Sequence, residues 1–119
     1  MDEPAAAQLI STHTAEHYTW GANCDGWFLL KAENLHVIQE RMSPGTSEVM
    51  HYHCKSRQLF YVLRGQLTMQ MHSQSITIPA GHAIVIDPSV PHQARNESAE
   101  RIEFLVISAP PSHGDRFNC

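Results

Sequence analysis

The sequence is poor in charged residues and has no basic run. Only 17% of its 119 residues are Asp, Glu, Lys or Arg, whereas roughly a quarter is usual for a globular domain. The formal net charge is −4, and the eight Lys and Arg residues do not cluster. We therefore expect neither nucleic acid nor an anionic membrane surface as a partner. The shortage of charge instead favours a homodimer, in which a second subunit covers part of the surface.

Disulfide and targeting patterns are also missing. Cys24, Cys54 and Cys119 form no C-x-x-C pair, and their odd number with no disulfide pattern points to a reducing compartment. Asp2 and Glu3 stand where a secretory signal would be basic and then apolar. No apolar run approaches the roughly 18 residues of a transmembrane helix. We expect a cytoplasmic protein, with no role assigned to the cysteines.

No sustained helical stripe occurs in the body of the chain. Short runs alternate polar and apolar residues, most clearly over residues 66–72, and turn signals recur about every 8–12 residues. This spacing predicts an all-β sandwich or barrel.

The length suits one domain. We expect an N-terminal arm over residues 1–14, a β-barrel over 15–108 and a C-terminal tail over 109–119. The tail begins at Pro110 and Pro111, which cannot continue a central strand.

Histidine is unusually frequent, with nine residues against eight Lys plus Arg. His51 and His53 are two positions apart and so share one face of a strand. Two such imidazoles can reach one ion at about 2.1 Å. Gln58 begins the next expected strand, and an antiparallel pairing of the two strands would bring it towards both histidines. His92 is the best-placed further ligand by sequence. Without other evidence, the two histidines of a His-x-His triplet more often lie on the surface and bind no metal.

The segment from Gly45 to Gly65 resembles the first motif of the cupin superfamily. That motif runs glycine, five residues, His-x-His, three or four residues, glutamate, six residues, glycine. Every spacing matches, and the one departure is Gln58 in place of glutamate.

The segment over residues 81–96 resembles the second cupin motif. Gly81, His92 and Asn96 match in register, while Asp87 and Ser89 replace its proline and glycine. The two motifs and the flanking strands extend the resemblance over nearly the whole chain.

The resemblance implies a double-stranded β-helix, or jelly-roll barrel, with one divalent metal near its mouth. His51, His53 and His92 carry over as ligands, with Gln58 as a fourth. Alternatively, Gln58 hydrogen-bonds a metal-bound water and leaves a three-histidine site. Ligand softness favours Fe, Ni, Zn, Cu or Mn. These neutral ligands leave two positive charges uncompensated, which favours an anionic ligand or bound hydroxide.

Three further residues are candidates for a substrate pocket. Phe60 shares the strand face of Gln58 and either lines the pocket or packs in the core. The C-terminal tail either folds back over the barrel mouth, offering His113 or Arg116, or lies on the surface. We expect no carboxylate within the first motif, which leaves His113, Tyr61 or a metal-bound hydroxide as the base.

These observations favour a small metalloenzyme that acts on a small, polar, oxygen-rich molecule. Its reaction is either oxygenase-like or isomerase- or lyase-like, and the missing motif carboxylate tilts the choice towards oxygen chemistry or plain binding. Two alternatives stay open. One is a non-catalytic module that binds or senses a small ligand, and the other is a metal-free barrel.

Overall fold

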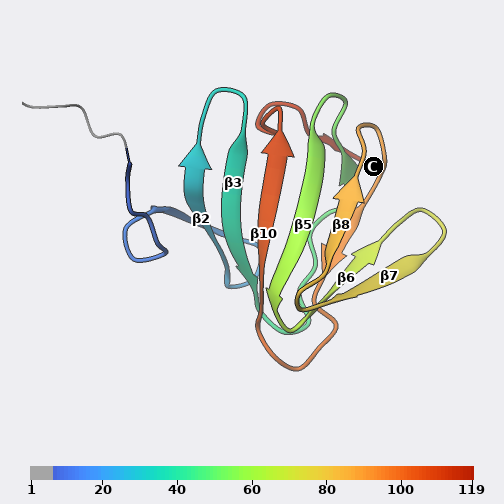
Figure 1. Ribbon diagram of the computed structural model, residues 1–119. Coiled ribbons are helices and arrows are strands. Elements are labelled where there is room, and N and C mark those ends of the chain that lie inside the picture. The colour runs from blue at the N-terminus through green and yellow to red at the C-terminus, as the bar shows by residue number, and fades with distance from the viewer. Residues whose placement is uncertain (1–6) are drawn as a thin grey trace, which may run out of the picture.

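The computed structural model describes residues 7–119, which form an all-β structure with no helix in that range (Figure 1). Accordingly, these residues include no helix long and apolar enough to cross a membrane. The start of the expected N-terminal arm, residues 1–6, lies outside the described residues, and residues 7–15 form no strand. The strands are β1 (Glu16–Trp20), β2 (Cys24–Lys31), β3 (His36–Met42), β4 (His51–Tyr52), β5 (Arg57–Arg64), β6 (Gln66–Gln70), β7 (Ser75–Pro79), β8 (Ala83–Ile86), β9 (Gln93–Arg95), β10 (Ile102–Ala109) and β11 (Phe117–Asn118).

One layer is a six-stranded antiparallel sheet in the order β1-β2-β3-β10-β5-β8. The other layer contains β7-β6-β9 and the pair β11-β4. The bridge between His51 and His92 connects these two parts. The two layers enclose the interior, as expected for the jelly-roll barrel, and β6 and β7 diverge from the large sheet in Figure 1.

The apolar core fills the interior where inward-facing residues of both layers meet. Alternation along β5 and β10 buries every second side chain, and β6 adds the fully buried Leu67 and Met69. The completely buried apolar side chains are Cys24, Met42, Val62, Leu67, Met69, Ile102 and Phe104. Burying a large apolar side chain contributes about 1.5–3 kcal/mol, which makes this cluster the main source of stability.

The turn between β5 and β6 depends on Gly65, the last residue of the first motif. Its φ is +79°, a left-handed conformation that favours glycine. A Cβ there would also lie 2.6 Å from Cγ2 of Ile102. The motif glycine is thus a requirement of the fold and not of the site.

The first part of the first motif, residues 45–51, lies beside the last part of the second motif, residues 92–96, in the second layer. Backbone hydrogen bonds join the amide of Gly45 to the carbonyl of Asn96 at 2.9 Å and the amide of Glu48 to the carbonyl of Ala94 at 3.0 Å. His51 and His92 exchange both of their backbone hydrogen bonds, at 3.0 and 2.9 Å. Residues directly opposite in such a pair present their side chains on the same face. This pairing brings histidines 41 positions apart in sequence onto one surface.

Candidate metal centre

Three buried histidines form a cluster inside the barrel. His51 and His53 are 3% and 5% exposed, and His92 is fully buried. One ring nitrogen from each lies within 4.8 Å of the others. The sequence therefore predicted correctly that these three imidazoles converge.

All three rings are held by the same kind of hydrogen bond. Nδ1 of His51 lies 2.7 Å from the carbonyl oxygen of Val49, and Nδ1 of His92 lies 2.9 Å from that of Val90. Nδ1 of His53 lies 2.7 Å from the carbonyl oxygen of Asp115. A carbonyl only accepts, so each Nδ1 carries the proton and each Nε2 presents a lone pair. This tautomer and its backbone tether are typical of imidazoles that bind a metal.

Burial keeps the imidazoles of His51 and His92 neutral. Burial lowers the pKa of His51 to about 3, against the opposing effect of its hydrogen bond to Val49. Burial also lowers the pKa of His92, and the neighbouring His53 and Arg116 lower it further. A metal has no proton to displace at such nitrogens near neutral pH.

Gln58 reaches the cluster from the opposite layer. Its Nε2 donates to Oγ of Ser108 at 3.0 Å, which turns Oε1 towards Nε2 of His92 at 3.2 Å. The expectation that β4 and β5 pair as antiparallel neighbours is wrong. Residues 53–56 cross between the layers, so β4 pairs with β11 while β5 lies between β10 and β8. Gln58 therefore faces the histidines across the barrel.

Two features of the cluster fit a cation. Within residues 7–119, Nε2 of His53 is buried without a hydrogen-bond partner. Nε2 of His92 and Oε1 of Gln58 each carry a lone pair and no hydrogen, yet they face each other. A buried polar atom without a partner costs about 1–3 kcal/mol, and a shared metal would satisfy all of these atoms. The donor set suits a transition metal.

A pocket of about 490 Å³ opens beside this cluster. That volume lies within the range of small-molecule sites. Its walls include His51, His53 and Gln58, whereas His92 lies behind them. Phe60, His113 and Arg116, which the sequence suggested for a substrate pocket, also line it. Phe60 is buried, while the other two are exposed at the mouth.

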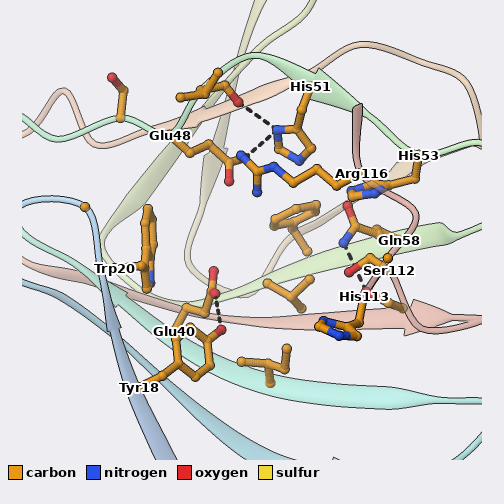
Figure 2. Close-up of a pocket in the computed structure, with 18 residues that line it drawn as sticks. Tyr18, Trp20, Glu40, Glu48, His51, His53, Gln58, Ser112, His113 and Arg116 are labelled. Carbon is orange, nitrogen blue, oxygen red and sulfur yellow. Dashed lines mark hydrogen bonds and ion pairs between the residues drawn. The ribbon is translucent and has the colours of Figure 1, made fainter. Parts of the chain in front are cut away.

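The C-terminal tail folds back over the cluster. β11 pairs with β4, with Phe117 opposite Tyr52 and Asn118 opposite His51. The last part of the expected tail thus belongs to the second layer. Arg116 extends along the pocket wall towards Glu48 and His51 (Figure 2).

The sequence reasoning missed a carboxyl group inside the first motif. Glu48 lines the pocket, and its Oε1 accepts the Ala94 amide hydrogen at 3.0 Å and lies 3.9 Å from Nδ1 of His51. The expectation of no carboxylate there is wrong, because Glu48 stands three residues after Gly45 and the irregular backbone of residues 48–50 brings its side chain into the pocket. Burial raises the pKa of Glu48 to about 8. Tyr61, by contrast, is exposed on the outer face and absent from the pocket lining.

A second carboxyl group, on β3 of the six-stranded sheet, also lines the pocket. The hydroxyl of Tyr18 donates to Oε2 of Glu40 at 2.7 Å, and both side chains line the pocket with Trp20 (Figure 2). Burial raises the pKa of Glu40 to about 7. Glu40 lies on the face of β3 that also presents Ile38 and Met42, so a charge on an apolar face was the available sequence signal.

The fold and the histidine cluster define a double-stranded β-helix of the cupin class. The cupin domain family model Cupin_2 matches residues 38–108, more than half of the chain. The chain belongs to this cupin family.

A sequence relative is an uncharacterised protein of Methanocaldococcus jannaschii, 31% identical over 72 residues. The match covers 60% of this chain and 58% of that protein, so the chain spans under two thirds of the relative's length.

Solved structures share the fold at low sequence identity. The polyketide cyclase RemF of Streptomyces resistomycificus has a TM-score of 0.80 and 18% identity, over 94% of this chain and 84% of that one. A cupin sugar phosphate isomerase of Silicibacter pomeroyi has a TM-score of 0.75 and 19% identity, over 87% and 76%. A predicted oxalate decarboxylase of Thermotoga maritima has a TM-score of 0.77 and 18% identity, over 87% and 100%.

Proposed function

We propose that the protein is a metal-dependent enzyme that transfers protons on a small, oxygen-rich, anionic substrate. One divalent transition metal would be held by Nε2 of His51, His53 and His92, with Oε1 of Gln58 as a fourth ligand. When bound, the metal would supply a Lewis acid that polarises substrate oxygens. The observation that carries the proposal is a carboxyl group, Glu48, which lines the same pocket as His51 and His53 and lies 3.9 Å from Nδ1 of His51.

The charges in the pocket favour an anionic substrate. A divalent ion among neutral ligands keeps its full charge, and the Arg116 guanidinium lies on the same wall. Arg116 would bind a substrate carboxylate or phosphate, since its planar group matches either. The hydrogen-bonded pair of Tyr18 and Glu40 would hydrogen-bond substrate hydroxyl groups.

Glu48 would be the group that moves the proton. Its pKa of about 8 is set by burial, and positive charge from a bound metal would lower it towards neutrality. A general acid–base group works best when its pKa lies near the operating pH. The hydrogen bond from Ala94 fixes the carboxyl group, so it can take a proton from carbon and return it at a defined place.

Fold relatives with isomerase, decarboxylase and cyclase names support catalysis of this general kind. They share only the fold, so the reaction itself rests on the pocket. The presence of Glu48 in the pocket favours isomerase- or lyase-like chemistry over the oxygenase-like alternative.

Metal analysis and isotope exchange test the proposal together. Protein purified without added metal should contain about one transition metal ion per chain by elemental analysis, and His51→Ala should lose the ion while keeping its circular dichroism spectrum. Incubation with small hydroxy and oxo acids in D₂O should place deuterium on the substrate carbon. Glu48→Gln should abolish that exchange and still bind metal.

Other outcomes distinguish the alternatives. Oxygen consumption that persists in Glu48→Gln would point to an oxygenase, and saturable ligand binding without exchange would point to a sensing module. If the wild-type protein takes up no metal, the metal-free barrel is the alternative that remains. The homodimer and the cytoplasmic location stay predictions, and sedimentation velocity tests the first.

A further inference from the structure

The three imidazoles differ in where their tethers come from. His51 and His92 bond carbonyls two residues before their own positions, so each tether is local. The carbonyl that holds His53 belongs to Asp115, 62 residues further along the chain. The orientation of His53 therefore depends on the C-terminal segment, residues 110–119.

The side chain of Asp115 anchors the loop that follows His53. Its Oδ1 accepts the amide hydrogen of Cys54 at 3.0 Å. Its Oδ2 accepts those of Lys55 and Ser56, at 2.8 and 2.9 Å. Hydrogen bonds to a charged acceptor are roughly twice as strong as neutral ones, so three together form a firm attachment at the point where the chain crosses between layers.

The rest of the segment supports the same docking. β11 pairs with β4, and the amide of Cys119 donates to the carbonyl of Met50 at 3.0 Å. The rings of Phe117 and Tyr52 stack with centroids 5.4 Å apart. The end of residues 110–119 therefore runs along β4, which carries His51 and directly precedes His53.

We infer that Asp115 is a positioning residue, which holds His53 in its metal-binding orientation and couples docking of residues 110–119 to metal binding. This inference rests on the proposed metal site. Partners that orient a metal ligand typically contribute 10- to 100-fold to metal affinity. Because coupling is reciprocal, the metal should in turn stabilise the docked segment.

Co²⁺ binding is the first test, read from visible absorption and from competition with a chelator. Asp115→Ala should bind Co²⁺ about 10- to 100-fold more weakly than wild type. Asp115→Asn keeps one acceptor oxygen, so its affinity for Co²⁺ should lie between those of the wild type and Asp115→Ala. Glu97→Gln, which changes an exposed acid paired with Arg95, is the matched control and should bind as wild type does.

A second measurement needs no metal. Nitrogen-15 NMR of the metal-free protein should show all three histidines protonated at Nδ1. In Asp115→Ala, the signals of His53 alone should shift towards a mixture of tautomers, whereas a general loss of stability would affect all three. If that variant fails to fold, Asp115→Asn takes its place. Hydrogen exchange of the amides of residues 54–56 in the wild type is the other substitute, and this exchange should slow when Co²⁺ is added.

The outcomes separate this inference from the proposed function. Equal Co²⁺ affinity in wild type and Asp115→Ala, with unchanged His53 signals, would overturn the role of Asp115 and leave the metal site standing. If His51→Ala binds Co²⁺ as tightly as the wild type does, the proposed metal site itself is wrong. The coupling then fails with it, although the NMR result still decides whether Asp115 orients His53.

Discussion

β5 and β10 run side by side through two different environments. At one end Gln58 lies opposite Ser108, and both are buried and polar. Two residues further along each strand, Phe60 lies opposite Val106, and beyond them Val62 lies opposite Phe104. The same alternation therefore builds a hydrogen-bonded site at one end and a dry core at the other.

The two ends of these strands separate the residues that stabilise the barrel from those that form its candidate site. Buried polar groups at the polar end form hydrogen bonds, such as that between Gln58 and Ser108 or the tethers of the histidines. Such groups contribute little net stability, because folding exchanges their hydrogen bonds to water for internal ones. The apolar end must supply most of the folding free energy, and the polar end is then free to serve chemistry. Four substitutions test this division.

The largest effect is expected at the apolar end. Phe104→Ala removes a fully buried ring and should lower the free energy of unfolding by about 3–5 kcal/mol, measured by urea denaturation. Metal affinity of the folded fraction should stay at the wild-type value. A large loss of affinity would show that the two ends are not independent.

Glu40→Gln should change how stability depends on pH. The folded pKa of Glu40, about 7, is raised by burial above its ordinary value of 4.5. The folded state then binds the proton more tightly than the unfolded state, so this group lowers stability as pH rises from about 4.5 through 7. The variant should lose that decline and gain about 3 kcal/mol at pH 8, measured by denaturation across pH. Glu16→Gln, at an exposed acid paired with Lys31, should follow the wild-type profile.

Gln58→Glu should tighten metal binding and weaken anion binding. The change restores the carboxylate of the first cupin motif and adds one negative charge to a neutral ligand set. We expect metal affinity to rise about tenfold, equal to about 1.4 kcal/mol, by calorimetry. Gln58→Leu is the matched variant, and equal affinities in both would remove Gln58 from the ligand set.

Ser108→Ala should have the smallest effect. It leaves Nε2 of Gln58 without its acceptor in a buried place, which costs about 1 kcal/mol. Metal affinity should fall slightly, because the amide is then free to turn its oxygen away from His92. Ser75→Ala, at an exposed serine, should change neither property.

Much of the fold and the histidine cluster was predictable from the sequence. Alternation and turn spacing predicted an all-β barrel, and the glycines and histidines of the two motifs identified the family that the comparison confirms. These signals are local because they depend on strand period and on short, fixed spacings. Glu40 was also visible in principle, as a charge on the apolar face of β3.

Other parts of the site depended on contacts between distant segments. Glu48 enters the pocket because its segment pairs irregularly with residues near Ala94, and no period in the sequence reveals this. Asp115 reaches His53 across 62 positions. The sequence determined which side chains alternate inward and where strands turn, since those depend on neighbours. Only the tertiary structure decided which acid lies beside the histidine cluster and which carbonyl orients His53, because long-range pairing sets those distances.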